Sequence, residues 1–142
     1  MQVRGMRELE AEAKRFVAAL HPRAEAVVVA LSGELGAGKT AFVKAVTKAL
    51  GVREHVTSPT FVIMKIYELE RQKFQKLVHI DAYRLKGMHH LKVLGWEELV
   101  RDPHNLIFVE WPEQVAEAMP KGAVCVGLRY SGEDIREITY AP

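Results

Sequence analysis

The sequence contains a single cysteine, Cys125, and no long uninterrupted hydrophobic run. A lone cysteine can form no disulfide within the chain, which favours a reducing compartment. No stretch reaches the roughly 20 apolar residues of a membrane-spanning helix, and the charged side chains throughout residues 4–15 are not typical of a signal peptide. We therefore expect a cytoplasmic protein without membrane association, in which Cys125, flanked by valines, is a small buried hydrophobic residue.

An excess of one charge is also lacking, since the formal net charge is +2 and 27% of the 142 residues are charged. The hydrophobic share of 49% excludes a disordered or collagen-like chain, and the length predicts a single domain over residues 1–142. Charge is nevertheless unevenly distributed. Residues 65–92 carry 7 Lys or Arg against 3 Asp or Glu, and residues 93–142 carry 4 against 9. This asymmetry indicates either two docking surfaces or ordinary solvated surface.

Hydrophobic periodicity predicts a mixed sequence of helices and strands. Residues 9–20 and 39–50 show helical spacing, and the apolar run 26–31 does not alternate, which is typical of a strand buried on both faces in a parallel sheet. The remaining expected elements are a hairpin of strands 60–69 and 76–82, a helix over 91–100, a strand over 106–109, a short helix over 113–119, and a hairpin of strands 123–130 and 136–140. The predicted fold class is α/β, with a mixed, mostly parallel sheet flanked by helices, as in P-loop NTPases.

The segment between the first predicted strand and the helix over 39–50 matches the phosphate-binding loop pattern Gly-x4-Gly-Lys-Ser/Thr. Glycines let successive backbone N–H groups approach phosphate oxygens, and the helix adds the positive end of its dipole. Lys39 can reach the β- and γ-phosphates, and the Thr40 hydroxyl can bind Mg²⁺. The expected nucleotide-binding residues of the loop are Gly33, Glu34, Leu35, Gly36, Ala37, Gly38, Lys39 and Thr40.

A nucleotide site of this kind also needs a carboxylate near the metal, usually at the end of a neighbouring strand. Asp81 and Glu110 each follow a short apolar run, and the sequence does not decide which is closer to the metal. Asn-Lys-x-Asp and Asp-x-x-Gly, the motifs of guanine-specific GTPases, are both missing, so ATP is the expected nucleotide. The chain also has no arginine-rich lid, which disfavours a small-molecule kinase but leaves it an alternative. A nucleotide-dependent binding switch without useful turnover is another.

Four motifs taken in order resemble the bacterial TsaE (YjeE) family, the ATPase component of the machinery for tRNA threonylcarbamoyladenosine biosynthesis. They are the phosphate loop at 33–40, Ser-Pro-Thr-Phe at 58–61, His-Ile-Asp-Ala-Tyr-Arg-Leu at 79–85 and Val-Glu-Trp-Pro-Glu at 109–113. The resemblance implies ATP and Mg²⁺ as cofactors. It also implies partner subunits, TsaD and TsaB, which place a threonylcarbamoyl group on adenosine 37 of tRNAs that read codons beginning with A. We expect tRNA contact to be indirect, through that complex.

The resemblance also carries over to single positions. Asp81 and Glu110 match the family's acidic residues near the metal, so the expected metal ligands are Thr40, Asp81 and Glu110. Ser58 and Thr60 match a switch-like segment in which a hydroxyl senses the γ-phosphate. The expected catalytic residues are Lys39, Asp81, Glu110 and Thr60. One departure is Thr57, where many relatives have a lysine.

Three further residues of these motifs keep open roles. Trp111 matches a family tryptophan, and a core or interface anchor is an equal alternative. Arg84 can contact a phosphate, a partner or a local acid, and His79 is expected to be a packed or hydrogen-bonded histidine rather than a base. The sequence shows no evident arginine finger, a group that contributes about 10³ to 10⁵ in rate. Hydrolysis is therefore expected to be slow for the protein alone and faster with its partners.

Overall fold

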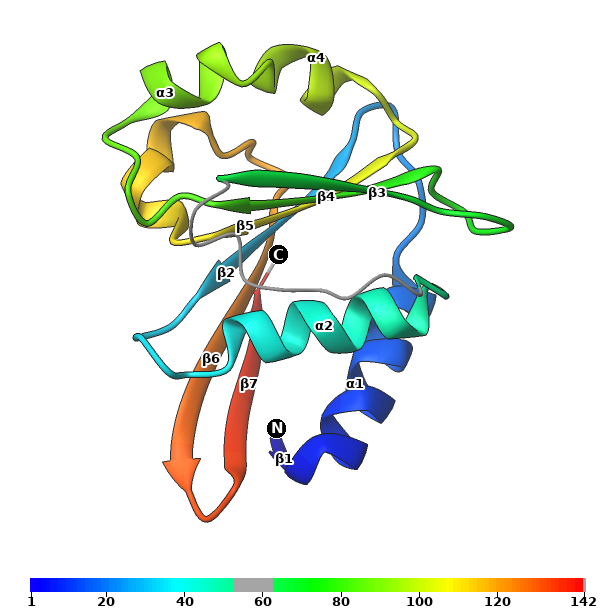
Figure 1. The fold of residues 1–142 in the computed structure, drawn as a ribbon, viewed down its shortest axis with the longest axis vertical. Helices are drawn as coiled ribbons and strands as arrows, with labels where there is room; N and C mark the ends of the chain where they lie inside the picture. Colours follow the sequence, from blue (N-terminus) through cyan, green and yellow to red (C-terminus); the bar gives the residue numbers. More distant parts are fainter. Residues whose placement is uncertain (53–62, 142) are drawn as a thin grey trace.

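A computed structural model describes residues 1–52 and 63–141 of the chain (Figure 1). The residues after Val52 and before Ile63 include Ser58 and Thr60, so both expectations for that segment lie outside the described residues. The elements in chain order are β1 (Gln2–Arg4), α1 (Gly5–Ala19), β2 (Val27–Ser32), α2 (Lys39–Ala49), β3 (Met64–Glu68), β4 (Lys76–Asp81), α3 (Met88–Val93), α4 (Trp96–Arg101), β5 (Asn105–Glu110), the 3₁₀ helix η1 (Pro112–Ala118), β6 (Val124–Gly132) and β7 (Ile135–Ala141).

The strands form one seven-stranded sheet in the order β1-β7-β6-β2-β5-β4-β3. The four central strands β6, β2, β5 and β4 are parallel to one another, and the outer strands pair antiparallel. The predicted α/β class with a mixed sheet flanked by helices is therefore confirmed. Because the parallel strands β2, β5 and β4 end at the same edge, the residues that follow them are brought together, which is where open α/β sheets bind ligands.

Each face of the sheet has its own hydrophobic core, because side chains of a strand alternate between faces. On one face α1 and α2 pack on residues such as Val29, Leu31 and Phe108. On the other, α3, α4 and η1 pack on residues such as Val28 and Ile107. Figure 1 shows these helices above and below the central strands. The non-alternating apolar run of β2 is thus explained by burial on both faces, as its sequence predicted.

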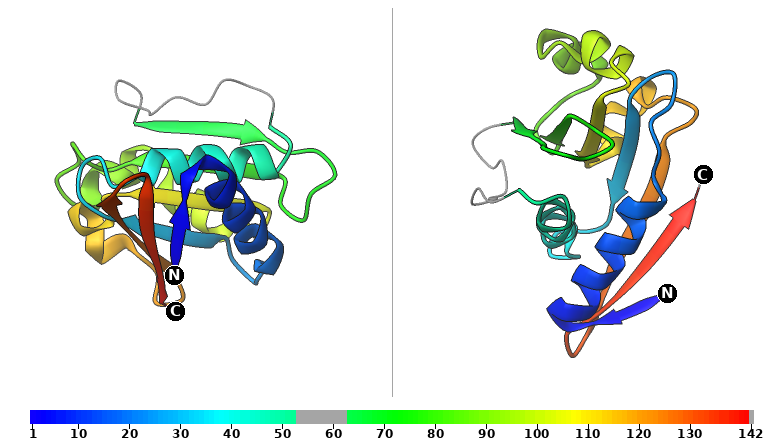
Figure 2. Two further views of the ribbon diagram at one scale, coloured as in Figure 1. Left: turned by 90° about the horizontal axis from the view of Figure 1, so that it is seen from below. Right: turned by 90° about the vertical axis from the view of Figure 1, so that its right-hand side faces the viewer.

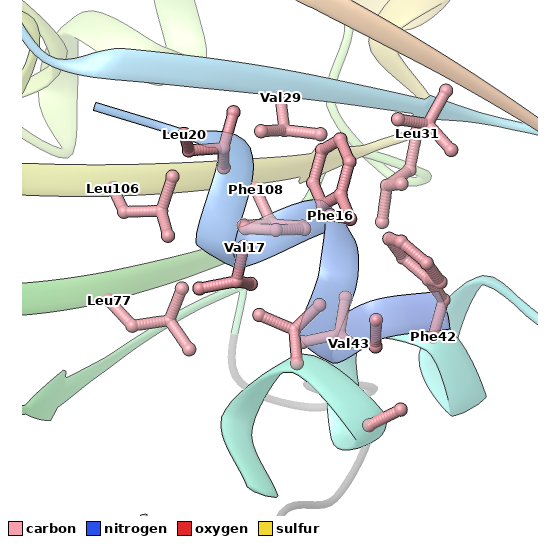
Figure 3. Close-up of a cluster of buried hydrophobic side chains, with 14 of the residues drawn as sticks. Phe16, Val17, Leu20, Val29, Leu31, Phe42, Val43, Leu77, Leu106 and Phe108 are labelled. Carbon is pink, nitrogen blue, oxygen red and sulfur yellow. The ribbon is translucent and has the colours of Figure 1, made fainter. Parts of the chain in front are cut away.

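The core between the sheet and the helices α1 and α2 contains an aromatic cluster (Figure 3). Phe16 of α1 lies with its ring centroid 5.6 Å from that of Phe42 in α2 and 6.4 Å from that of Phe108 in β5. Tilted and edge-on pairs at such separations add about 0.5–1.5 kcal/mol beyond burial. The cluster fastens both helices to the sheet and so holds α2, which begins at Lys39, in a defined position against β5.

The β6–β7 hairpin extends beyond the central strands, with α1 alongside it (Figure 2). Strand β1 was not predicted, because its three residues carry no periodic signal of their own. It pairs antiparallel with β7, and the N-terminal ammonium donates to the carbonyl of Ile138 at 3.1 Å. In residues 1–52 and 63–141, no helix has the length and apolar character to cross a membrane.

Two sequence predictions differ from the structure. The helix expected over 91–100 is two short helices, because Gly95 adopts a left-handed conformation with φ 85° and starts α4 anew. The prediction that Cys125 is buried is wrong, since its side chain is exposed. Its neighbours Val124 and Val126 point to the face covered by α1 and α2, so Cys125 points to the opposite face.

Candidate functional site

The loop between β2 and α2 has backbone geometry that depends on glycine. Gly33 and Gly38 have φ of 151° and 105°, values that other residues rarely adopt. A Cβ on Gly33 would lie 2.5 Å from the carbonyl oxygen of Leu128, and one on Gly38 would lie 2.5 Å from Nε of Arg136. The loop is therefore packed closely against the β6–β7 hairpin, which restrains the conformation of its backbone.

Lys39, the first residue of α2, is 6% exposed. Its ammonium donates a hydrogen bond to the carbonyl of Gly33 and lies 3.5 Å from the centroid of the Trp111 ring. Burial lowers the pKa of Lys39, although the nearby Glu110, Glu113 and Asp81 carboxylates oppose this. Trp111 itself has a left-handed backbone, with φ 60° and ψ 52°, which is unusual for a bulky residue and often marks a functional site. The lysine is thus a desolvated cation held between the loop and an aromatic face.

Two carboxylates meet at the ends of β4 and β5. The parallel register pairs Glu110 of β5 with Leu31 of β2 on one side and with Asp81 of β4 on the other. Glu110 therefore lies beside the end of β2, and Asp81 lies one strand further away. Both carboxylate oxygens of Glu110 lie 3.5 Å from the Thr40 hydroxyl oxygen. Asp81 instead accepts a hydrogen bond from the backbone N–H of Tyr83 at 3.0 Å. The described contacts therefore bring Glu110, rather than Asp81, to Thr40.

These residues surround one pocket of about 370 Å³. Seven of the expected site residues line it, namely Leu35, Gly36, Gly38, Lys39, Thr40, Asp81 and Glu110. Gly33, Glu34 and Ala37 belong to the same loop but do not line this pocket. The structure adds Ala41, Ile63 and Tyr83 to the lining, and it places Arg84 and Trp111 there too. The aromatic rings of Tyr83 and Trp111 lie with centroids 5.0 Å apart.

Two residues that the sequence did not assign to the site contact it in the structure. His79 contacts Glu110, and Arg136 lies against Gly38 of the loop. The prediction that His79 is hydrogen-bonded is confirmed, since its Nε2 lies 2.5 Å from Oε2 of Glu110. Strand alternation from Asp81 could have pointed to His79, because the two share a face of β4. No local signal relates Arg136 to Gly38, since they are distant in sequence and meet only through the order of strands in the sheet.

Asp81→Asn is expected to stabilise the nucleotide-free protein at neutral pH. Burial, and then the neighbouring Glu110 carboxylate, raise the pKa of Asp81, while its hydrogen bond from Tyr83 opposes the shift. A carboxyl with a raised folded-state pKa destabilises the fold where it is ionised, and this penalty vanishes as the pH falls toward the unfolded value of 3.8. Thermal unfolding in EDTA should therefore show a higher Tm for the variant at pH 7.5 and a shrinking difference toward pH 4.

Asp102→Asn is the matched control with the opposite sign. Hydrogen bonds from His104, the backbone one first, lower the pKa of Asp102. Its ionised form therefore stabilises the fold above its unfolded pKa, and the variant should gain no stability at pH 7.5. A lower Tm for Asp81→Asn at pH 7.5 would contradict the prediction for Asp81.

Comparison with known proteins adds sequence evidence to this geometry. The chain matches the family described as "Threonylcarbamoyl adenosine biosynthesis protein TsaE" over residues 4–138. It is 38% identical over 117 residues to the tRNA threonylcarbamoyladenosine biosynthesis protein TsaE of Treponema pallidum, covering 82% of this chain and 83% of that protein. It is 34% identical over 125 residues to the TsaE of Rickettsia bellii, covering 87% and 81%.

A solved structure is also similar. The crystal structure of YdiB from Bacillus subtilis superposes with a TM-score of 0.77 at 30% sequence identity, covering 99% of this chain and 82% of that one. The fold around the pocket is thus shared with a protein of known structure over almost every residue of the chain. Since the family match spans nearly the whole sequence and the relatives align over most of both chains, this protein belongs to the TsaE family of threonylcarbamoyl adenosine biosynthesis proteins.

Proposed function

We propose that this protein is the ATP-binding and ATP-hydrolysing component of the machinery that forms N6-threonylcarbamoyladenosine at position 37 of tRNAs reading codons that begin with A. It acts as a single cytoplasmic domain and as an ATP-driven switch for partner subunits, TsaD and TsaB, which supply the contact with tRNA. The observation that carries the proposal is the meeting of Lys39, Thr40 and Glu110 in one pocket of a TsaE family member.

The residues of the pocket fit a nucleotide with Mg²⁺. Mg²⁺ prefers oxygen ligands and binds through one or two carboxylates together with substrate phosphates. The Thr40 hydroxyl and the Glu110 carboxylate present such oxygens beside each other, and Asp81 is adjacent. When bound, the ion neutralises charge on the phosphate oxygens. The loop amides and the N-terminus of α2 complement the same negative charge.

The chain's own residues then have separate roles. Phosphate oxygens replace the Gly33 carbonyl as the partner of the Lys39 ammonium, which in the nucleotide-free protein is bonded back to its own loop. Glu110 would bind the metal beside Thr40 or orient the attacking water, and Asp81 of the neighbouring strand would be a further metal ligand. Trp111 covers Lys39 from the other side and excludes water from it. Catalysis of this kind is mostly positioning and charge stabilisation.

Hydrolysis by the isolated protein is expected to be slow. Among the described residues that line the pocket, the cations are Lys39, which belongs to the phosphate loop, and Arg84, which is exposed. No arginine is therefore held rigidly against the position of the γ-phosphate by these residues. Since an arginine finger contributes about 10³ to 10⁵ in rate, a partner that completes the site should accelerate turnover strongly.

The test is ATP hydrolysis and tRNA modification reconstituted with and without TsaD and TsaB. Faster ATP turnover in the complex, together with tRNA modification that requires this protein, is the expected result. Equal hydrolysis rates with and without the partners contradict the partner-driven part of the proposal. Transfer of labelled phosphate to a small molecule instead of water identifies a kinase, and tRNA modification without any turnover identifies a pure binding switch.

A further inference from the structure

Glu110 contacts a buried histidine of the neighbouring strand. The register of β4 and β5 pairs His79 with Phe108 and Asp81 with Glu110. His79 and Glu110 are therefore diagonal neighbours on the face covered by α1 and α2, where Leu77 and Phe108 also point. His79 is 0% exposed, Glu110 is 3% exposed, and the atoms His79 Nε2 and Glu110 Oε2 are 2.5 Å apart.

The chemistry of the two groups determines which of them donates the hydrogen bond. An ionised carboxylate has no hydrogen to donate, so the ring donates through its Nε2–H. The other ring nitrogen, Nδ1, is buried and has no hydrogen-bond partner within residues 1–52 and 63–141. The one polar contact that the structure gives His79 in this part of the chain is thus the bond to Glu110.

The contacts of the Glu110 carboxylate differ in length. The Thr40 hydroxyl lies 3.5 Å from either Glu110 oxygen, the long limit for a hydrogen bond, so it restrains the carboxylate weakly. The short contact from His79 involves Oε2, whereas Oε1 has the long contact with Thr40. We propose that His79 is a positioning residue whose ring N–H holds the Glu110 carboxylate in the orientation that faces Thr40. This rests on the proposed Mg²⁺–nucleotide site.

If His79 only filled space in the core, its substitution would have a different effect. Leu77 and Phe108, which share the face of His79, are apolar, and an apolar side chain of similar volume would suit that surrounding at least as well as an imidazole. If His79 only fills space, His79→Leu should leave the site unchanged. If it positions Glu110, the same variant releases the carboxylate, and loss of such a partner of a metal-binding group typically costs about 10- to 100-fold in metal affinity or activity.

The experiment measures binding of a fluorescent ATP analogue as Mg²⁺ is titrated, and also in EDTA, for three variants. His79→Leu has no donor, and His79→Asn has an amide that is too short to reach Glu110. Both should need about 10- to 100-fold more Mg²⁺ for half-maximal tight binding. His79→Gln, whose amide nitrogen can occupy the place of Nε2, should stay within about threefold of the wild type. Binding in EDTA should be unchanged in all three, because the phosphate loop is intact.

His89→Leu, an exposed histidine of α3, is the matched control, and thermal unfolding shows which variants are folded. A folded His79→Leu or His79→Asn variant with the wild-type Mg²⁺ requirement overturns the inference, as does His79→Gln with a shift equal to that of His79→Leu. If His79→Leu does not fold, His79→Asn decides between the two roles. A wild-type protein whose ATP binding ignores Mg²⁺ overturns the proposed function itself, so the two failures are distinguishable.

Discussion

Lys39→Met is expected to reduce kcat for ATP hydrolysis by about 10² to 10³ and to weaken ATP binding, while the protein stays folded. The ammonium is the buried cation of the phosphate loop, and removing one preorganised donor from such a site costs about this much in rate. Methionine is an unbranched side chain one atom shorter than lysine, so the change removes the charge near the Trp111 ring without leaving a large cavity. Steady-state hydrolysis and nucleotide binding measure both effects.

The same variant should be at least as stable as the wild type. Burial lowers the pKa of Lys39, so its charged form is less favourable in the folded than in the unfolded protein. This cost is present throughout the neutral range, below the unfolded pKa, and disappears in the variant. Lys44→Met, at an exposed position of the same helix, is the control and should change neither hydrolysis nor binding. If Lys39→Met kept more than a tenth of wild-type ATP turnover, this would contradict the catalytic role proposed for Lys39.

Glu110→Gln is expected to lower ATP turnover by about 10² to 10⁴, with ATP binding in EDTA changed by less than threefold. The amide keeps the shape of the carboxylate and its contact with Thr40, but it loses the charge that a metal or a water-orienting base requires. Slow turnover with retained binding would give a form trapped with ATP. Single-turnover hydrolysis and equilibrium binding, measured side by side, separate the two steps.

Glu113→Gln is the matched control, because Glu113 is an exposed acid three residues further along the chain. It should retain turnover within about twofold. If Glu110→Gln hydrolyses ATP at the wild-type rate while Asp81→Asn does not, the two carboxylates have exchanged the roles proposed for them. The trapped form also tests the switch, since it should bind the TsaD and TsaB subunits more persistently than the wild type does.

Agreement between sequence and structure is closest where the information is local. The predicted strand 26–31 and helix 39–50 correspond to β2 at Val27–Ser32 and α2 at Lys39–Ala49. Each is specified by a contiguous pattern, and the glycines between them dictate the turn. The predicted hairpin of 123–130 and 136–140 likewise corresponds to β6 and β7. The splitting of the helix near Gly95 and the pairing of β1 with β7 were missed, because a single glycine or three residues carry too weak a local signal.

The sequence by itself determined the phosphate loop, because its glycines, Lys39 and Thr40 are consecutive and their chemistry follows from their order. It also supplied both acids, Asp81 and Glu110, without deciding between them. Only the tertiary structure brings Glu110 into contact with Thr40 and with His79, and Arg136 close to Gly38. These contacts join residues that are distant in the chain, and they depend on strand order and register. Those are set by the packing of the whole sheet rather than by any local pattern.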